Sequence, residues 1–83
     1  MSRRPSEFSD AFALALEKRR KEGNLSRQAL AEKAGLHQTY IGMIERGLSN
    51  PSLDAAFAIA EALDMPFSKL ISEAEALRKR DLK

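Results

Sequence analysis

The sequence of 83 residues contains no cysteine and only one histidine. The lack of cysteine excludes disulfide bonds, thiol catalysis and cysteine-ligated zinc. The single histidine, His37, cannot supply the ligand set of an ordinary metal site. We therefore expect no metal and no other cofactor, and the composition fits a reducing, cytoplasmic setting.

Long apolar runs are also missing. Arg3 and Arg4 are followed by no apolar segment, and no run of about 18 apolar residues occurs, so we expect neither a signal peptide nor a membrane span. A chain this short buries only about 60% of its unfolded surface, which leaves little room for a deep cavity. The sequence has no nucleophile paired with a base and no glycine-rich phosphate loop, so it does not indicate an enzyme.

The net charge of +2 is modest, and its distribution is more informative than its size. Basic residues cluster in KRRK at 18–21 and in RKR at 78–80. The simplest interpretation of both runs is a solvated helix end, where cations suit the negative end of the helix dipole.

Apolar residues recur at spacings of three and four, and no stretch alternates with a period of two. This pattern predicts an all-α protein, a compact bundle of five short helices. The expected helices cover about 6–22, 26–33 and 37 or 38 to 45, followed by a helix capped by Ser52 and one that begins at Pro66. Ser26 is the expected N-cap of the second helix. We expect a domain over 1–72 and a charged extension of the last helix over 73–83.

The last two helices carry clear apolar stripes. The stripe of the fourth is Leu53, Ala56, Ala60 and Leu63, and that of the fifth continues through Ala74 and Leu77. An apolar face that extends beyond the core of so small a domain usually needs a partner. We therefore expect a homodimer, and the alternative is that the stripe closes over the first helix. The expected interface residues are Phe67, Leu70, Ile71 and Leu77.

The segment around Gly35 predicts a helix-turn-helix. Gly35 permits the positive φ of a tight turn, and the next helix begins with polar residues while only Ile41 and Ile44 face inward. In this motif the second helix lies in the DNA major groove, with its N-terminal side chains against base edges.

The stretch LSRQALAEKAGLHQTYIGMIERGLSNPSLDAAFAIAEALDMPFSKLI, residues 25–71, resembles the phage repressor/Cro-like helix-turn-helix family, also called the XRE class. The resemblance implies a lambda repressor-like domain that acts as a dimer on partly palindromic double-stranded DNA. On this basis we expect base contacts from His37, Gln38, Thr39 and Met43, and phosphate contacts from Arg27, Gln28, Tyr40, Arg46, Ser49 and Asn50.

Several of these residues have specific expected roles. The amide of Gln38 can bond both N6 and N7 of adenine, whereas Met43 can read only a thymine methyl. Tyr40 can either donate its hydroxyl to a phosphate or pack its ring at the edge of the helix. Gly42 stands where the family usually has a longer polar residue, which indicates either a close approach of the backbone to DNA or simple drift. The resemblance also pairs Arg20 with Glu45 in a largely buried salt bridge.

Three function classes remain open at this point. The first is a sequence-specific transcriptional regulator, with repression as the expected effect. The second is the DNA-binding antitoxin of a toxin–antitoxin pair, which would also bind a toxin. The third is a protein-interaction domain that shares the fold without binding DNA, because a fold alone does not define a function.

Overall fold

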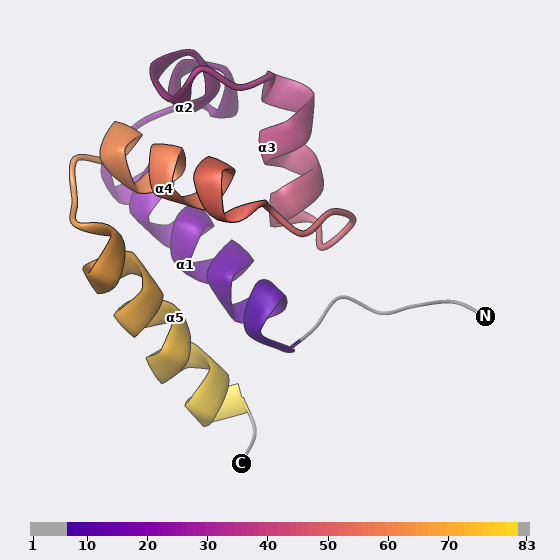
Figure 1. Cartoon of the computed structure of the whole chain (residues 1–83), viewed down its shortest axis with the longest axis vertical. Helices are drawn as coiled ribbons and strands as arrows, with labels where there is room; N and C mark the ends of the chain where they lie inside the picture. The colour runs from indigo at the N-terminus through magenta and orange to yellow at the C-terminus, as the bar shows by residue number, and fades with distance from the viewer. Residues whose placement is uncertain (1–6, 82–83) are drawn as a thin grey trace.

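Figure 1 shows a computed structural model of the protein, which describes the backbone of residues 7–81 and the side chains of residues 8–79. The described range contains five α-helices and no strand, so the all-α expectation is confirmed. Arg3, Arg4 and Ser6, the expected first residue of the first helix, lie outside it. The helices are α1 (Glu7–Glu22), α2 (Arg27–Ala34), α3 (Gln38–Glu45), α4 (Leu53–Ala62) and α5 (Phe67–Asp81).

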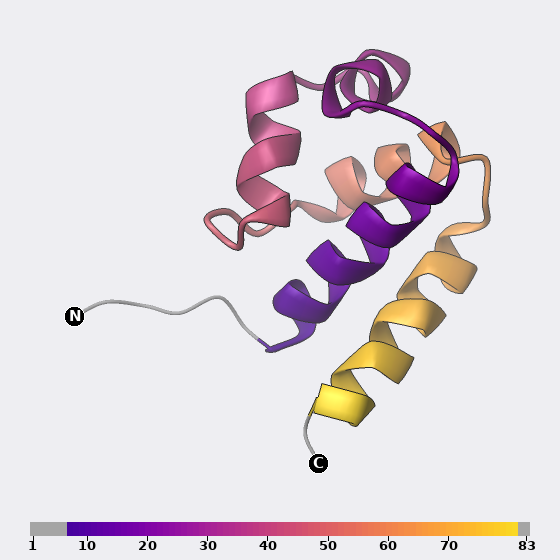
Figure 2. The same cartoon turned by 180° about the vertical axis from the view of Figure 1, so that it is seen from behind.

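The two long helices α1 and α5 lie side by side in both Figure 1 and Figure 2. Helices α2 and α3 sit together at one end, and α4 contacts both α2 and α5. Every helix contributes to a single core, whose largest fully buried side chains are Leu16, Leu30, Ile41, Ile44, Ile59 and Leu70. None of the described helices is long and apolar enough to cross a membrane.

Serine side chains cap α2 and α4 as expected. The Ser26 hydroxyl accepts a hydrogen bond from the backbone N of Ala29 over 3.0 Å, and the Ser52 hydroxyl accepts one from Ala55 N at the same distance. Each bond satisfies a backbone donor that the first turn of a helix cannot pair internally. These caps fix where both helices begin.

Two expectations for the last helices need correction. Pro66 precedes α5 instead of opening it, and its carbonyl oxygen accepts hydrogen bonds from the backbone N of Lys69 and of Leu70. Leu53 was expected in the inward stripe of α4 but is 79% exposed. Ala56 and Ala60 of the expected stripe are buried as expected, and the rotation of α4 turns three further residues inward in place of Leu53: Ala55, Ile59 and Ala62.

The apolar stripe of α5 packs over α1 within the chain, and the dimer interface expected on α5 remains a prediction. Leu70 and Ala74 are fully buried, and Phe67, Ile71 and Leu77 pack partly buried against the same core. Leu70 offers no exposed surface to a partner, because its own chain covers it completely. Helix α5 is unbroken across residue 72, so the structure marks no boundary there.

Candidate nucleic-acid interface

The turn between α2 and α3 is three residues long and is fixed by glycine. Gly35 adopts φ of 73°, in the left-handed region that residues with a Cβ atom rarely enter. The backbone N of Leu36 then donates to the carbonyl of Ala31 over 2.9 Å, and the Leu36 side chain packs against the core. This arrangement holds α3 in a fixed position relative to α2.

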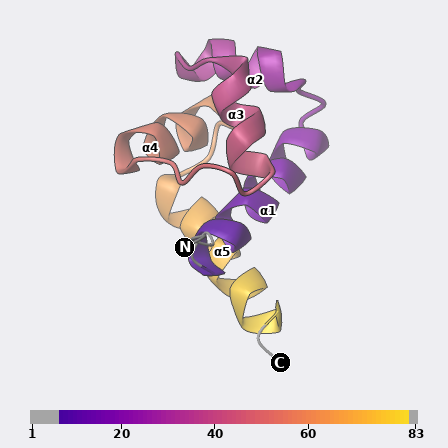
Figure 3. The ribbon, with the colours of Figure 1, turned by 90° about the vertical axis from the view of Figure 1, so that its right-hand side faces the viewer.

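Helix α3 has one buried face and one open face. Ile41 and Ile44 are buried, whereas the residues at its start are exposed. His37 occupies the N-cap position with an extended backbone, but its side chain makes no capping hydrogen bond. The view in Figure 3 places α3 at the front of the molecule, with α2 above it. Its polar N-terminal side chains are therefore free to meet a partner.

The residues expected to contact DNA come from three neighbouring segments, which are the start of α2, the outer face of α3 and the loop that follows it. The exposed ones are Gln28, His37, Gln38, Thr39, Arg46 and Asn50, and the partly buried ones are Arg27, Tyr40, Met43 and Ser49. None of them is covered completely by the protein's own chain. Their contacts with bases and phosphates remain predictions.

An ion-pair network behind the open face joins α1, α2 and α3. The carboxylate of Glu45, only 1% exposed, accepts hydrogen bonds from Arg20 Nε over 2.7 Å and from Arg20 Nη2 over 3.0 Å. Arg20 Nη1 also donates to the backbone carbonyl of Leu25. The structure therefore contains the buried Arg20–Glu45 bridge that the family resemblance implied.

A second cation, Arg27, binds the same carboxylate. Its Nε donates to Glu45 Oε1 over 2.8 Å, while its side chain stays 37% exposed. Burial acts to raise the pKa of Glu45, but the hydrogen bonds and charges of Arg20 and Arg27 outweigh burial and hold that pKa below its ordinary value. Two arginines on one carboxylate leave one surplus positive charge, and Arg27 carries it at the surface.

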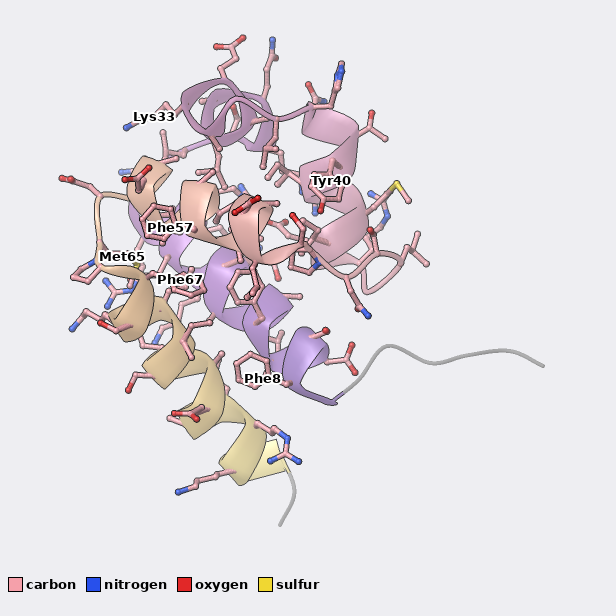
Figure 4. The ribbon with its side chains drawn as sticks, viewed as in Figure 1. Phe8, Lys33, Tyr40, Phe57, Met65 and Phe67 are labelled. Atoms are coloured by element: carbon pink, nitrogen blue, oxygen red, sulfur yellow. The ribbon has the colours of Figure 1, made fainter. Side chains whose placement is uncertain are left out.

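Tyr40 packs its ring at the edge of α3, against the core. Its hydroxyl oxygen accepts a hydrogen bond from the backbone N of Ser52 over 3.3 Å, which ties α3 to the start of α4. Figure 4 shows the ring between these two elements. The hydroxyl still has its own proton to donate, so the packed ring is compatible with a phosphate contact.

An apolar patch that was not expected from the sequence is formed by Leu53, Phe57 and Phe67. Phe57 is 49% exposed, and its ring meets that of Phe67 edge-on, with centroids 5.8 Å apart. Figure 4 shows the two rings together on the side of the molecule away from α3. The available signal was Phe57 itself, four residues after Leu53 and outside the alanine stripe of α4.

The described side chains contain no group of three or more His, Cys, Asp or Glu residues that could hold a metal ion. The structure contains two short helices joined by a tight turn, and the second helix presents polar side chains and is flanked by cations. These features define a helix-turn-helix protein. Residues 16–70 match the family model HTH_3, helix-turn-helix, and the chain belongs to that family.

Individual relatives agree with this assignment. Over 49 residues, 59% of this chain and 58% of that protein, the chain is 45% identical to control protein C.SmaI of Serratia marcescens. Over 60 residues, 72% of this chain and 42% of that protein, it is 40% identical to the immunity repressor protein of Bacillus phage phi105. The chain thus spans about half the length of these curated relatives.

A solved structure gives the same result. The restriction-modification controller protein C.AhdI from Aeromonas hydrophila superposes with a TM-score of 0.72 and 35% identity, over 75% of this chain and 94% of that one. The fold expected from the sequence, a five-helix bundle of the repressor type, is therefore confirmed.

Proposed function

We propose that the protein is a DNA-binding transcriptional regulator that places α3 in the major groove of its operator. The observation that carries this proposal is the open polar face at the start of α3, held by a fixed turn in a chain of the helix-turn-helix family. The relatives named above, a control protein and an immunity repressor, support a regulatory role and favour repression. The proposal includes no catalytic step and places the protein in the cytoplasm with its DNA.

In this proposal the first turn of α3 contacts the bases. The exposed side chains of Gln38 and Thr39 reach base edges, and the amide of Gln38 pairs with adenine. His37 stands beside them without a capping bond, so its ring is available to the groove. Met43 lies one turn further along, where its thioether meets a thymine methyl.

Residues of α2, of α3 and of the loop after α3 bind the DNA phosphates. Arg27 carries the surplus charge of the Glu45 network, and Gln28 stands next to it at the exposed start of α2. Ser49 and Asn50, in the loop after α3, bind the DNA backbone from the other side, and Tyr40 of α3 binds it through its hydroxyl. Such contacts orient a protein on the duplex without reading its sequence.

A homodimer completes the proposal, with the patch of Leu53, Phe57 and Phe67 as its contact surface. Large side chains that stand exposed together on a small domain usually mark an interaction site. The partly buried Ile71 lies one turn after Phe67 on α5 and extends the patch. A symmetric dimer presents two copies of α3, so its operator contains two related half-sites.

Selection of bound sequences from a random duplex pool at low salt tests this function. We expect an enriched, partly palindromic site with half-sites about 10 base pairs apart, centre to centre, or a multiple of that spacing. Inserting five base pairs between the half-sites should abolish tight binding, because it moves them to opposite sides of the duplex. If the protein binds no duplex even at low salt, the proposal is wrong.

A further inference from the structure

The guanidinium group of Arg46 lies over the backbone of Gly42, in the middle of α3. A Cβ atom placed on Gly42 would be 3.1 Å from Arg46 Nη1 and 3.8 Å from both Cζ and Nη2. Apart from the adjacent residues and the backbone of the helix itself, these three atoms are the nearest to that Cβ position. The tip of Arg46 thus occupies the space that a side chain at position 42 would fill.

Helix geometry explains how the tip reaches this place. Residues four apart share a face of a helix, and side chains lean toward its N-terminus. Arg46 therefore points back along α3, over Gly42 and toward Gln38, which lies one turn further on the same face. Because Gly42 has no side chain, nothing at that position separates the cation from the surface of the helix.

The donors of Arg46 are also available. Within the described residues Arg46 forms no ion pair, whereas Arg19, Arg20 and Arg27 each bind a glutamate. The Arg46 guanidinium lies over Gly42, on the face of α3 that begins with Gln38, the side chain expected to read a base.

We propose that Arg46 reads a guanine in each half-site and that Gly42 is the positioning residue that allows it to do so. The fork of a guanidinium matches the O6 and N7 acceptors that guanine presents in the major groove. This inference rests on the proposed function and revises it at one residue, since the family resemblance gave Arg46 a phosphate. It also explains the glycine in the middle of a helix, where glycine is a poor helix former.

The role of Gly42 can be separated from folding. Alanine favours a helix more than glycine does, and its Cβ would displace only the flexible end of Arg46 by a few tenths of an ångström. A leucine at the same position fills the space entirely and forces the guanidinium off the helix face. Gly42→Ala and Gly42→Leu therefore form a graded pair, with thermal melting as the check that both variants fold.

The test compares the base preferences of the parent, Arg46→Ala, Gly42→Ala and Gly42→Leu in parallel selections from one random duplex pool. The parent should enrich a guanine at one position of each half-site. Arg46→Ala should lose that preference by roughly 5- to 150-fold while keeping the preference due to Gln38. Gly42→Leu should weaken the same position, and Gly42→Ala should weaken it less.

Two results would overturn the inference while leaving the proposed function intact. One is a loss in Arg46→Ala that is equal for all duplexes and accompanied by a lower salt slope, which identifies a phosphate contact. The other is a Gly42→Leu variant that folds and selects the same bases as the parent, which removes the positioning role. A parent protein that binds no duplex contradicts the proposed function itself.

Discussion

Arg27 and Glu45 are joined by a hydrogen bond of 2.8 Å from Nε to Oε1, on a carboxylate that Arg20 already binds through two nitrogens. The Arg20 side chain is only 10% exposed, so Arg20 neutralises Glu45 within the core. Arg27 is the outer of the two cations. Glu45 therefore has two roles. It pairs with Arg20 in the core, and it fixes the positive charge of Arg27 at the start of α2, beside the open face of α3.

The first prediction concerns the stability that Glu45 provides. Glu45→Gln leaves Arg20 without a charge partner in the core, and removing one member of a buried pair costs roughly 3–5 kcal/mol. For a domain of this size we expect the melting temperature to fall by at least ~10 °C. Glu73→Gln is the control, because its pair with Arg19 on the outside of α1 and α5 is far less buried. Equal melting of Glu45→Gln and the parent would contradict a structural role for the bridge.

The same carboxylate predicts how stability depends on pH. The pKa of Glu45 is lower in the folded protein than in the unfolded chain, so the unfolded chain binds more protons as the pH falls. The stability due to Glu45 is therefore present above its ordinary pKa and is lost as the pH falls through the lowered value. Urea unfolding between about pH 3 and 6 should show this loss. In Glu45→Gln the pH dependence should be shallower, and an unchanged slope would exclude Glu45 as its source.

Local signals in the sequence were sufficient for most of the fold. Ser26 and Ser52 predicted two helix starts, and Gly35 predicted the turn, because each acts through backbone groups a few residues away. The rotation of α4 could not be found in this way. Leu53 fits the helical period as well as Ile59 does, and only contacts with α2 and α5 decide which of them is buried.

The candidate site shows the same limit. The polar start of α3 could be predicted from the order of residue types alone. The sequence could not predict that Arg27 also binds Glu45 or that Arg46 lies over Gly42, because both depend on side-chain directions in three dimensions. The sequence raised two explanations for Gly42 and offered no means of choosing between them. The position of Arg46 over Gly42 supplies a third explanation, which is that glycine leaves room for the side chain of Arg46.

Arg27 should contribute affinity without selectivity. Arg27→Ala removes the exposed cation and leaves Glu45 paired with Arg20, so the protein should keep its fold. We expect weaker binding to every duplex by a similar factor and a salt slope lower by about one unit. Lys33→Ala is the control, since it removes the same charge from the other end of α2. A salt slope that is unchanged in Arg27→Ala, measured by fluorescence anisotropy, would exclude a phosphate contact.

The apolar patch predicts the surface of self-association. Phe57→Glu places a charge where two aromatic rings would otherwise be covered, so the variant should sediment as a monomer at concentrations where the parent is a dimer. Leu48→Glu makes the same kind of change at a leucine that is 66% exposed outside the patch, and this variant should remain dimeric. A parent that is monomeric at high micromolar concentration, or a Phe57→Glu variant that still dimerises, contradicts this choice of surface.

Gln38 and Gln28 offer a matched comparison between reading a base and holding a phosphate. Both side chains are exposed, and both variants lose the same amide, but Gln38 opens α3 whereas Gln28 stands in the first turn of α2. Gln38→Ala should cost about 1–3 kcal/mol on the selected operator and little on random DNA, because a base contact is made only where the matching base is present. Gln28→Ala should weaken binding to both duplexes by the same smaller factor, because phosphates are identical everywhere.

The measurement is the ratio of operator affinity to random-DNA affinity at one salt concentration, with melting curves to confirm that both variants fold. If that ratio is the same in Gln38→Ala and in the parent, Gln38 does not read a base, and the selectivity of α3 must come from its other residues.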